Sequence, residues 1–400
     1  MIKTFLFCTG LLCAISLNCA TLNKEKHRNH NFDRAAITLE SMYNNYQIHN
    51  SCLLRETYPI GINYSADYLA SEESNNTPNK YSYLWPYSGT FTAVNTMFEA
   101  SDFSQIYKKT LEKRVLLGLE KYLDTKRNPT AYSSYITSAS KSDRFYDDNI
   151  WIGIDFLDIY FLTHENKYLS KAKMIWNFIQ SGTDEKLGGG IYWCEQKKES
   201  KNTCSNAPGA VYALKLFQAT NDSTFLMQGE KLYEWTKKNL QDTEDYLYFD
   251  NINLDKKIGR AKFAYNSGQM MQAASILYKL TKNSEYLLDA QNIAKGCSDF
   301  FFTKFVTPSG EKIKLIKKGD VWFSAVMLRG FIELYNIDKN RIYLDDFDKS
   351  LDYAWQHARE KNGLFNSDFS GVKKDQKKWL LTQAAMVEMF SRIAIVFKNE

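Results

Sequence analysis

Proline and glycine are scarce in this sequence, which has only 6 and 19 of them among 400 residues. An all-β protein rich in turns needs many residues of both kinds, so this class is disfavoured. Histidine is rarer still, with 5 residues, and His49, His164 and His357 stand far apart. A histidine-based metal site or a catalytic triad is therefore not expected. We predict that the protein needs neither a metal ion nor another cofactor.

Dense runs of basic residues are also missing. The net charge of +5 is dispersed along the chain, which argues against a nucleic-acid partner. Three of the seven cysteines lie in the first twenty residues, and the other four are Cys52, Cys194, Cys204 and Cys297. Their spacing fits no standard zinc pattern. We expect buried or free thiols, although export would permit a disulfide between Cys194 and Cys204.

The first twenty residues have the composition of an export signal. Lys3 precedes an apolar stretch from Phe5 to Leu17, which is too short to span a bilayer comfortably. Two outcomes remain open: lipidation of Cys19 in a weakly matched lipobox, or cleavage near Ala20. We predict an exported protein of the periplasm or cell surface, in contact with a membrane only through such a lipid. A flexible tether would cover residues 21–32, and one domain residues 33–400.

What the sequence has in quantity is apolar residues, at 44%, and aromatic residues, at 15%. They recur in a pattern in which an apolar helix ends near a tyrosine, a short polar turn follows, and an aromatic residue opens an amphipathic helix. The second helices of these units begin at Tyr107, Tyr168, Phe225, Tyr286 and Tyr343, in steps of 61, 57, 61 and 57 residues. Repeats of this size are structural units that stack on their neighbours.

The two helices of a unit differ in character. Trp151–Leu162 is apolar on nearly all sides, whereas residues 168–179 are apolar on one face, so inner and outer helices alternate. Five such units, with helices near 33–47 and 379–397, predict an all-α (α/α)6 barrel of twelve helices, which we expect to be monomeric. Binding loops sit on rigid scaffolds, so function is expected in the segments that lead into the inner helices: 84–95, 144–151, 188–210, 260–271, 316–325 and 375–383.

Two adjacent acids, Asp147 and Asp148, stand directly before one of the buried runs. Aspartates at this place are commonly helix caps, or complement the helix dipole. Here, however, the start of the helix lies inside the barrel, and two carboxyls in a partly desolvated cleft cannot ionise equally easily. One ionised and one protonated carboxyl are what glycoside hydrolysis requires, and neighbouring positions suit the separation of about 5 Å found in retaining enzymes.

The segment "FYDDNIWIGIDFLDIY" resembles the signature of glycoside hydrolase family 76, the endo-α-1,6-mannanases. The resemblance extends through "GGGIYW", "KNTCSNAPGAVYAL", "AYNSGQMMQAASILY" and "DVWFSAVMLRGFIELY". It implies an (α/α)6 barrel, a partner that is an α-mannan polysaccharide or manno-oligosaccharide, and retaining cleavage with Asp147 as nucleophile and Asp148 as general acid/base. The chain departs from the family pattern at Asn251, where glycine is usual, and at Ala207-Pro208, where a bulkier residue is usual.

Further residues in these segments are typical of sugar contacts. They could also be structural, because glycines make turns, Asn206 is a possible helix cap and tryptophans seal cores. The candidate substrate-binding residues are Trp85, Asn149, Gly189, Gly190, Trp193, Asn202, Asn206, Asp250, Tyr265, Asn266, Gln269 and Trp322.

Three alternatives remain open on the sequence. An unsaturated glucuronyl hydrolase or a polysaccharide lyase shares the barrel and binds uronic acids, for which the basic residues of the same segments are suited: Lys197, Lys198, Lys201, Arg260, Lys262 and Lys318. Such an enzyme leaves the aspartate pair unexplained. A non-catalytic glycan-binding lipoprotein would use the same cleft without turnover. A transglycosylase would pass the sugar to a hydroxyl group instead of water.

Overall fold

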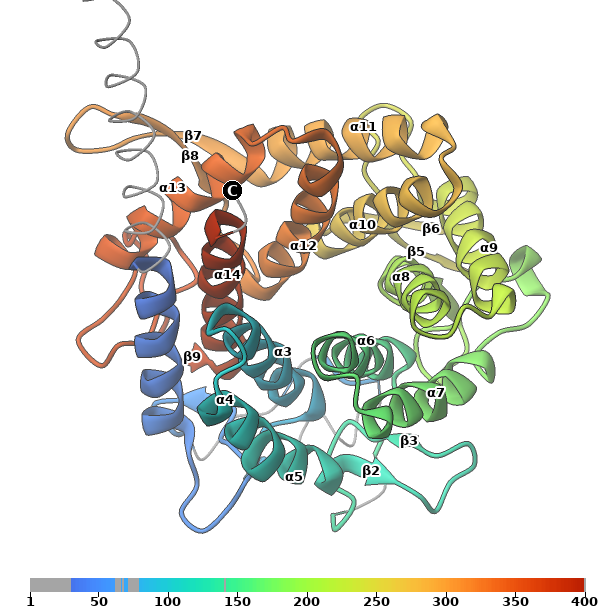
Figure 1. Cartoon of the computed structure of the whole chain (residues 1–400), viewed down its shortest axis with the longest axis horizontal. Helices are drawn as coiled ribbons and strands as arrows, with labels where there is room; N and C mark the ends of the chain where they lie inside the picture. Colours follow the sequence, from blue (N-terminus) through green and yellow to red (C-terminus); the bar gives the residue numbers. More distant parts are fainter. Residues whose placement is uncertain (1–29, 62–65, 67, 71–78, 140–141, 399–400) are drawn as a thin grey trace, which may run out of the picture.

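Two concentric rings of helices make up the structure, a computed structural model that describes residues 30–61, 66, 68–70, 79–139 and 142–398 (Figure 1). The inner ring contains α3 (Leu84–Ala100), α6 (Tyr146–Thr163), α8 (Thr203–Thr220), α10 (Ala264–Thr281), α12 (Val321–Asp338) and α14 (Leu380–Lys398). The outer ring contains the helix over residues 30–46, a composite second helix, α7 (Asn166–Gln180), α9 (Ser223–Leu240), α11 (Ser284–Phe301) and α13 (Ile342–His357). The composite helix consists of α4 (Gln105–Thr110), a π-helical turn (Leu111–Val115) and α5 (Leu116–Leu119). The predicted (α/α)6 barrel is confirmed.

The inner ring is closed, because each inner helix packs against the next and α14 packs against α3. The helix over 30–46 closes the outer ring: Asn31 Nδ2 donates to Asp348 Oδ1 at 3.1 Å, and Arg34 pairs with Asp352, both on α13. Residues 30–32, which we expected in the tether, are therefore already helical. The predicted export signal over 1–20, with Cys19, and residues 21–29 of the tether lie outside the described residues.

α14 is long and apolar enough to cross a membrane by length and composition alone, but 89% of that stretch is buried inside the molecule. Its apolar character follows from its place in the inner ring, where a helix is surrounded by neighbours and has little polar face to show.

The repeated step of the sequence comes from one kind of turn between inner and outer helix. α6, α8, α10 and α12 each end at a residue in the left-handed conformation, namely His164, Asn221, Lys282 and Lys339, and the outer helix begins two or three residues later. The aromatic residues predicted to open the outer helices are their second or third residues. The helices begin earlier because side chains such as Asp222 Oδ1, which accepts from Thr224 N at 3.0 Å, cap them.

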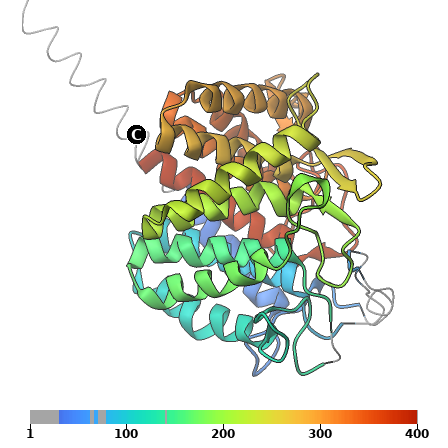
Figure 2. The same ribbon diagram turned by 90° about the vertical axis from the view of Figure 1, so that its right-hand side faces the viewer.

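Short strands gather at one mouth of the barrel, as the perpendicular view shows (Figure 2). The reason is topological, because several of them directly precede an inner helix. The strands are β1 (Thr57–Tyr58), β2 (Leu123–Asp124), β3 (Ala131–Tyr132), β4 (Ser200–Asn202), β5 (Phe249–Asn253), β6 (Ile258–Lys262), β7 (Phe302–Val306), β8 (Lys312–Ile316) and β9 (Lys378–Trp379). Antiparallel pairing joins β1 to β9, β2 to β3, β7 to β8, and β4, β5 and β6 in one sheet. The N-termini of the inner helices open at this mouth.

Inside the ring, a layer of aromatic side chains lies nearest the mouth. Trp322 is in ring contact with Trp151 at 5.1 Å, Trp85 at 5.6 Å and Tyr265 at 6.0 Å between centroids. Two helical turns further along the inner helices the side chains are polar or charged. Arg329 forms a bidentate ion pair with Glu388, at 2.7 and 3.0 Å.

A second cavity of about 220 Å³ lies in this polar layer and is lined by Thr92, Gln272 and Arg329 among others. Asp155 faces it and accepts two hydrogen bonds from Thr92 Oγ1, at 3.0 and 2.8 Å. Burial raises the pKa of Asp155 to about 8, although the nearby Arg329 lowers it. The aromatic layer thus separates a cavity at the mouth from a charged interior.

The buried carboxyl of Asp155 predicts a pH-dependent stability. Between about pH 4 and 8 the unfolded state has lost this proton while the folded state keeps it, so the free energy of unfolding falls as the pH rises, by up to about 1.4 kcal/mol per pH unit. Asp155→Asn imitates the protonated form and removes this dependence. Urea unfolding at pH 4.5, 6 and 7.5 should show a stability advantage of the variant that grows with pH. A constant difference would contradict the assignment.

Candidate active site

A cavity of about 480 Å³ opens at the mouth where the inner helices begin. Eight of the fourteen residues predicted for the site line it: Trp85, Asp147, Asp148, Trp193, Asn202, Asp250, Tyr265 and Trp322. The other side chains around it are Tyr68, Leu69, Tyr83, Ser134, Phe145, Trp151, Lys197, Glu199, Ser200, Cys204, Asn251, Phe263 and Phe323. An apolar cavity with a few convergent polar groups is the usual form of a small-molecule site.

Asp147 and Asp148 are the second and third residues of α6. The sequence suggested that one of them caps the helix, but the N-cap is Phe145, in an extended conformation and without a side-chain cap. Neighbouring side chains in a helix diverge by about 100°, yet both line the cavity. Asp147 Oδ1 accepts from the backbone N–H of Asp148 at 3.0 Å, so one carboxyl satisfies a free N–H of the first turn.

The two carboxyls differ in their surroundings. Burial raises the pKa of Asp147 to about 6, and hydrogen bonds from the Cys204 thiol, from backbone N–H groups and from the Trp193 side chain lower it. Burial, and then the negative charge of Asp147, raises the pKa of Asp148 well above its usual range. Donors to the charged form favour it, so Asp147 is the member of the pair that ionises first. The N-terminus of α6 adds positive potential at both.

A third carboxyl, Asp250 on β5, also lines the cavity. Burial raises its pKa, against a hydrogen bond from Asn251 Nδ2, which donates to Asp250 Oδ2 at 2.7 Å. The departure from glycine at Asn251 therefore supplies a donor to this acid. The Asn251 side chain lies against Gly259, where an added Cβ would come within 2.8 Å of Nδ2.

One wall of the cavity is built from stacked aromatic rings. Tyr265 and Phe323 stack with centroids 4.1 Å apart, Phe263 meets Phe323 at 5.5 Å, and Trp85 contacts Phe323 at 6.2 Å. Aromatic faces combine a large apolar surface with a specific geometry, which suits them to the apolar faces of sugar rings. Among these residues the sequence predicted Trp85 and Tyr265 and missed Phe263 and Phe323.

Two predicted substrate contacts, Asn149 and Asn206, are placed away from the cavity. The amide of Asn149 accepts from Tyr132 N at 2.8 Å and donates to Tyr132 O at 2.9 Å. Asn206 does the same with Ile191 N and O, at 2.7 and 2.9 Å. Each is the fourth residue of its inner helix and mimics a strand for an incoming segment, so both amides are fully used in holding the backbone.

Gly189, Gly190, Asn266 and Gln269 are also placed away from the cavity. Gly190, with φ of +84°, packs on the outer-ring residue Trp235, where an added Cβ would come within 2.7 Å of the indole. Packing on α9 and a left-handed turn therefore account for the glycines. Asn266 and Gln269 are fully buried within the ring, and Gln269 Nε2 donates to Gln272 Oε1 at 2.7 Å.

Sequence reasoning missed Trp151, Cys204 and Tyr68 as cavity residues. Trp151 carries a usable signal, because it lies three residues after Asp148 and so on the same face of α6. Cys204 was expected as a buried or free thiol. Among the described cysteines, all four are free and three, Cys194, Cys204 and Cys297, are buried, so that expectation is confirmed. The position of Cys204 near Asp147 follows only from the packing of α8 beside α6.

Comparison with known structures places this arrangement in a family. A glycoside hydrolase family 76 mannosidase from Bacteroides thetaiotaomicron is 32% identical, with a TM-score of 0.83, and the match covers 92% of this chain and 99% of that one. An inactive variant of an α-1,6-mannanase from Salegentibacter sp., with two adjacent aspartates replaced by asparagine, was solved with α-1,6-mannotriose. It is 25% identical, with a TM-score of 0.71, over 92% of this chain and 99% of that chain.

Among curated relatives, the meiotically up-regulated gene 191 protein of Schizosaccharomyces pombe is 28% identical over 225 residues, which are 52% of this chain. The match spans about half the length of that relative, 50%. The sequence profile of glycosyl hydrolase family 76 matches residues 61–314. This range includes the aspartate pair, the sheet of β4, β5 and β6, and all residues of the aromatic wall except Phe323. With the structural similarity over nearly the whole described chain, this match shows that the chain belongs to glycosyl hydrolase family 76.

Proposed function

We propose that this chain hydrolyses α-1,6-mannosidic bonds of mannan by a retaining double displacement. The observation that carries the proposal is the pair of neighbouring carboxyls in the cavity. Burial raises the pKa of both, and the charge of Asp147 raises that of Asp148 further. Family membership supports cleavage of a glycosidic bond. The Salegentibacter relative supports the linkage, since it was captured with α-1,6-mannotriose as an inactive variant that lacks two adjacent aspartates.

In the proposed mechanism, Asp147 attacks the anomeric carbon while Asp148 gives its proton to the leaving oxygen. The bond from the anomeric carbon to that oxygen breaks, and a bond to a carboxyl oxygen of Asp147 forms. Asp148, now ionised, takes a proton from water as the water displaces Asp147. The order of the two pKa values supports these roles, because the attacking group must be ionised and the donor must hold a proton near neutral pH.

Binding of uronic acids is less well supported. Among the described residues that line the cavity, Lys197 is the only lysine or arginine, and its Nζ lies 3.7 Å from Glu199. Lys201 is ion-paired with Asp184, and Lys262 with Asp242 and Asp245. Of the six basic residues that favoured a glucuronyl hydrolase or a lyase, these two are engaged elsewhere, and Lys198, Arg260 and Lys318 do not line the cavity either. A neutral mannan needs no such charges.

Unbranched α-1,6-mannan is the test substrate, with products separated by chromatography over time. If the enzyme cleaves within the chain, manno-oligosaccharides of several lengths should appear early in the reaction. Proton NMR of the first product should show the α anomer, as double displacement requires. An inverted first product would overturn the retaining mechanism. Products longer than the substrate would favour transglycosylation, and tight binding without any product would favour the non-catalytic glycan-binding protein.

A further inference from the structure

Two neighbouring residues of β5, Asp250 and Asn251, both line the cavity. Successive side chains of a regular strand point to opposite faces, so a regular β5 would turn one of them away. The strand is irregular here, because its pairing with β6 shifts register between Phe249 and Asn251. Bulges of this kind re-aim side chains and are frequent beside active sites. The irregularity therefore accounts for two adjacent polar side chains in one cavity wall.

The amide of Asn251 is bonded to the carboxyl beside it. Its Nδ2 donates to Asp250 Oδ2 at 2.7 Å, and a hydrogen bond to an ionised group is stronger than one between neutral groups. Among the described residues this is the single hydrogen bond to the Asp250 carboxyl. One oxygen is thus held by the protein, and Oδ1 keeps its capacity to accept from a ligand.

Gly259 on β6 makes room for the Asn251 side chain. The two residues are direct partners in the antiparallel pair, so their side chains would share one face of the sheet. A Cβ at Gly259 would lie 2.8 Å from Asn251 Nδ2 and 3.1 Å from its Cγ, closer than packed atoms come. Gly259 is not among the glycines with positive φ. The backbone therefore does not require glycine at this place, whereas the amide of Asn251 does.

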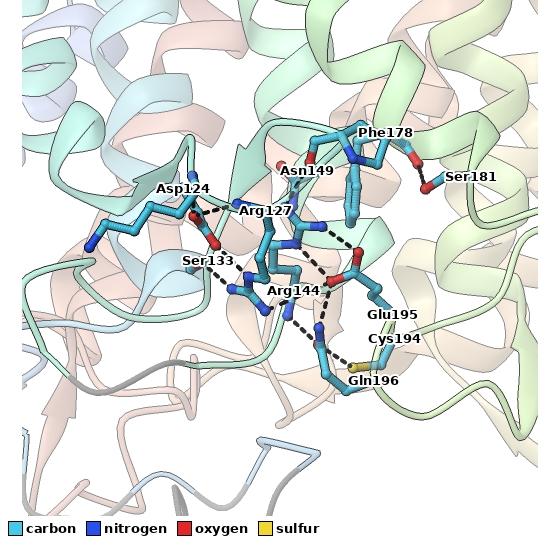
Figure 3. Close-up of polar contacts among 12 residues, drawn as sticks. Asp124, Arg127, Ser133, Arg144, Asn149, Phe178, Ser181, Cys194, Glu195 and Gln196 are labelled. Atoms are coloured by element: carbon cyan, nitrogen blue, oxygen red, sulfur yellow. Dashed lines mark hydrogen bonds and ion pairs between the residues drawn. The ribbon is translucent and has the colours of Figure 1, made fainter.

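The sheet that carries this amide is anchored to the start of α6. An antiparallel bridge between Phe145 and Cys194 pairs the segment before β4 with this helix start. The fully buried Arg144 holds the bridge, because its Nε donates to Glu195 Oε2 at 2.8 Å (Figure 3). The same segment pairs with β4 through Lys201, and β4 pairs with β5. Backbone pairing thus connects the helix start that bears the aspartate pair with the strand that bears the third carboxyl.

We propose that Asn251 is a positioning residue, which holds the Asp250 carboxyl through Oδ2 so that Oδ1 accepts a hydrogen bond from a hydroxyl group of the mannose unit in the cavity. Gly259 serves the same contact by leaving the amide its place. The proposal rests on the mannan substrate proposed above. A carboxylate accepts and cannot donate, so it selects hydroxyl groups, while the aromatic wall covers an apolar face of the sugar.

Two other roles of Asn251 must be separated from this one, namely direct contact with the sugar and support of the β5–β6 hairpin. A double-mutant cycle does so, because a residue that acts through Asp250 has no effect once Asp250 is replaced. The readout is the Kd of α-1,6-mannotriose in calorimetric titration. All variants also carry Asp147→Asn, which removes the proposed nucleophile, so that the sugar is not consumed.

We expect Asn251→Ala to weaken binding by about 3-fold to 10-fold, the cost of ordering one freed side chain when the sugar binds. Asp250→Ala should weaken it by about 10-fold to 100-fold, because a charged acceptor is lost. In the Asp250→Ala background, Asn251→Ala should change the Kd by less than about twofold.

Gly259→Ala reaches the same contact from β6, at a residue that does not line the cavity. The added methyl group collides with the Asn251 amide, so binding should weaken about as much as in Asn251→Ala. When both replacements are combined, the methyl group has room. The Kd of the combined variant should then equal that of Asn251→Ala alone, and a further loss would contradict the role given to Gly259.

The matched control is Asn253→Ala. Asn253 lies two residues further along β5, and its Oδ1 accepts from Lys257 N at 2.8 Å, a bond that supports the hairpin without involving Asp250. Its Kd should stay within about twofold of the parent value. Unchanged binding in Asn251→Ala, an equal loss in Asn253→Ala, or an undiminished loss in the Asp250→Ala background would overturn the proposal.

Turnover of α-1,6-mannan, measured with Asp147 intact, separates this proposal from the proposed function. If the protein leaves mannan uncut while the binding cycle gives the expected result, hydrolysis fails and the positioning role stands. If it cleaves mannan, and Asn251→Ala neither weakens binding nor raises KM, the positioning role alone fails. A protein that does not bind mannotriose at all overturns both.

Discussion

Asp147→Asn is expected to lower kcat on α-1,6-mannan by about 10⁴-fold to 10⁶-fold, the range seen when a catalytic nucleophile is removed. Asparagine has nearly the same shape as aspartate and keeps an oxygen that can accept from the Asp148 N–H, which now lies 3.0 Å from Asp147 Oδ1. It cannot form the glycosyl-enzyme bond. The loss should therefore appear in kcat and leave the structure of the first turn of α6 unchanged.

Binding separates this result from a damaged site. Calorimetric titration with α-1,6-mannotriose should give a Kd for Asp147→Asn within a few-fold of a value measured for wild type under non-hydrolysing conditions, because the aromatic wall is untouched. Replacing Tyr265 or Phe323, two stacked rings of the aromatic wall, is the complementary change. It should weaken the binding of α-1,6-mannotriose. Residual activity within tenfold of wild type would rule out Asp147 as the nucleophile.

The fold could be predicted from the sequence because the signal is local and repeated. The inner helices are buried on nearly all sides, each outer helix is apolar on one face, and several turns between them share a left-handed residue such as Asn221 or Lys282. The repeat did not predict the exact helix starts or the short strands at the mouth, such as β4, β5 and β6. Capping by Asp222 places the beginning of α9 two residues before the aromatic Phe225 that marks it in the sequence.

The sequence could not distinguish asparagine side chains that bind a sugar from those that hold the backbone. Asn149 and Asn206 have the residue type and position of sugar ligands. Each instead bonds the backbone N–H and carbonyl of one incoming residue and a carbonyl at the start of its own helix. Gln383 on α14 does the same for Phe365, at 2.7 and 3.0 Å. All three are fourth residues of inner helices. The repeat thus uses amides at this position to hold the segments of the mouth, a pairing that depends on tertiary contacts.

The aspartate pair was predictable because two charges before an apolar run are costly unless they are used. The difference between the two carboxyls was not, since it depends on groups far away in the sequence. Trp193 and Cys204 come from the loop and helix that follow α7, and neither is close to Asp147 in the chain. Only the packing of α8 beside α6, and the antiparallel bridge between Phe145 and Cys194, bring these two residues into the wall of the same cavity.

Asp148→Ala is expected to lower kcat on α-1,6-mannan by about 10²-fold to 10⁴-fold, because the leaving oxygen loses its proton donor. On an aryl mannoside whose leaving group needs no proton, the first step should proceed at nearly the wild-type rate. Only the second step, which needs a base for water, should remain slow. The alkaline limb of the pH–rate profile should also disappear, because it reports the deprotonation of the acid whose pKa burial and the charge of Asp147 raise.

Azide tests the second step in this variant, since it is an anion that attacks without a general base. It should displace Asp147 from the anomeric carbon of the glycosyl-enzyme, on the face that Asp148 served, and so restore turnover on the activated substrate. Two displacements give a mannosyl azide of retained configuration, the α anomer. Proton NMR of this product is the measurement, with Asp147→Asn as the matched control, in which no glycosyl-enzyme forms. Any azide product of the control arises by one direct displacement and has the inverted, β configuration. A β-mannosyl azide from Asp148→Ala, or an α-mannosyl azide from the control, would show that Asp147 is not the group that azide displaces.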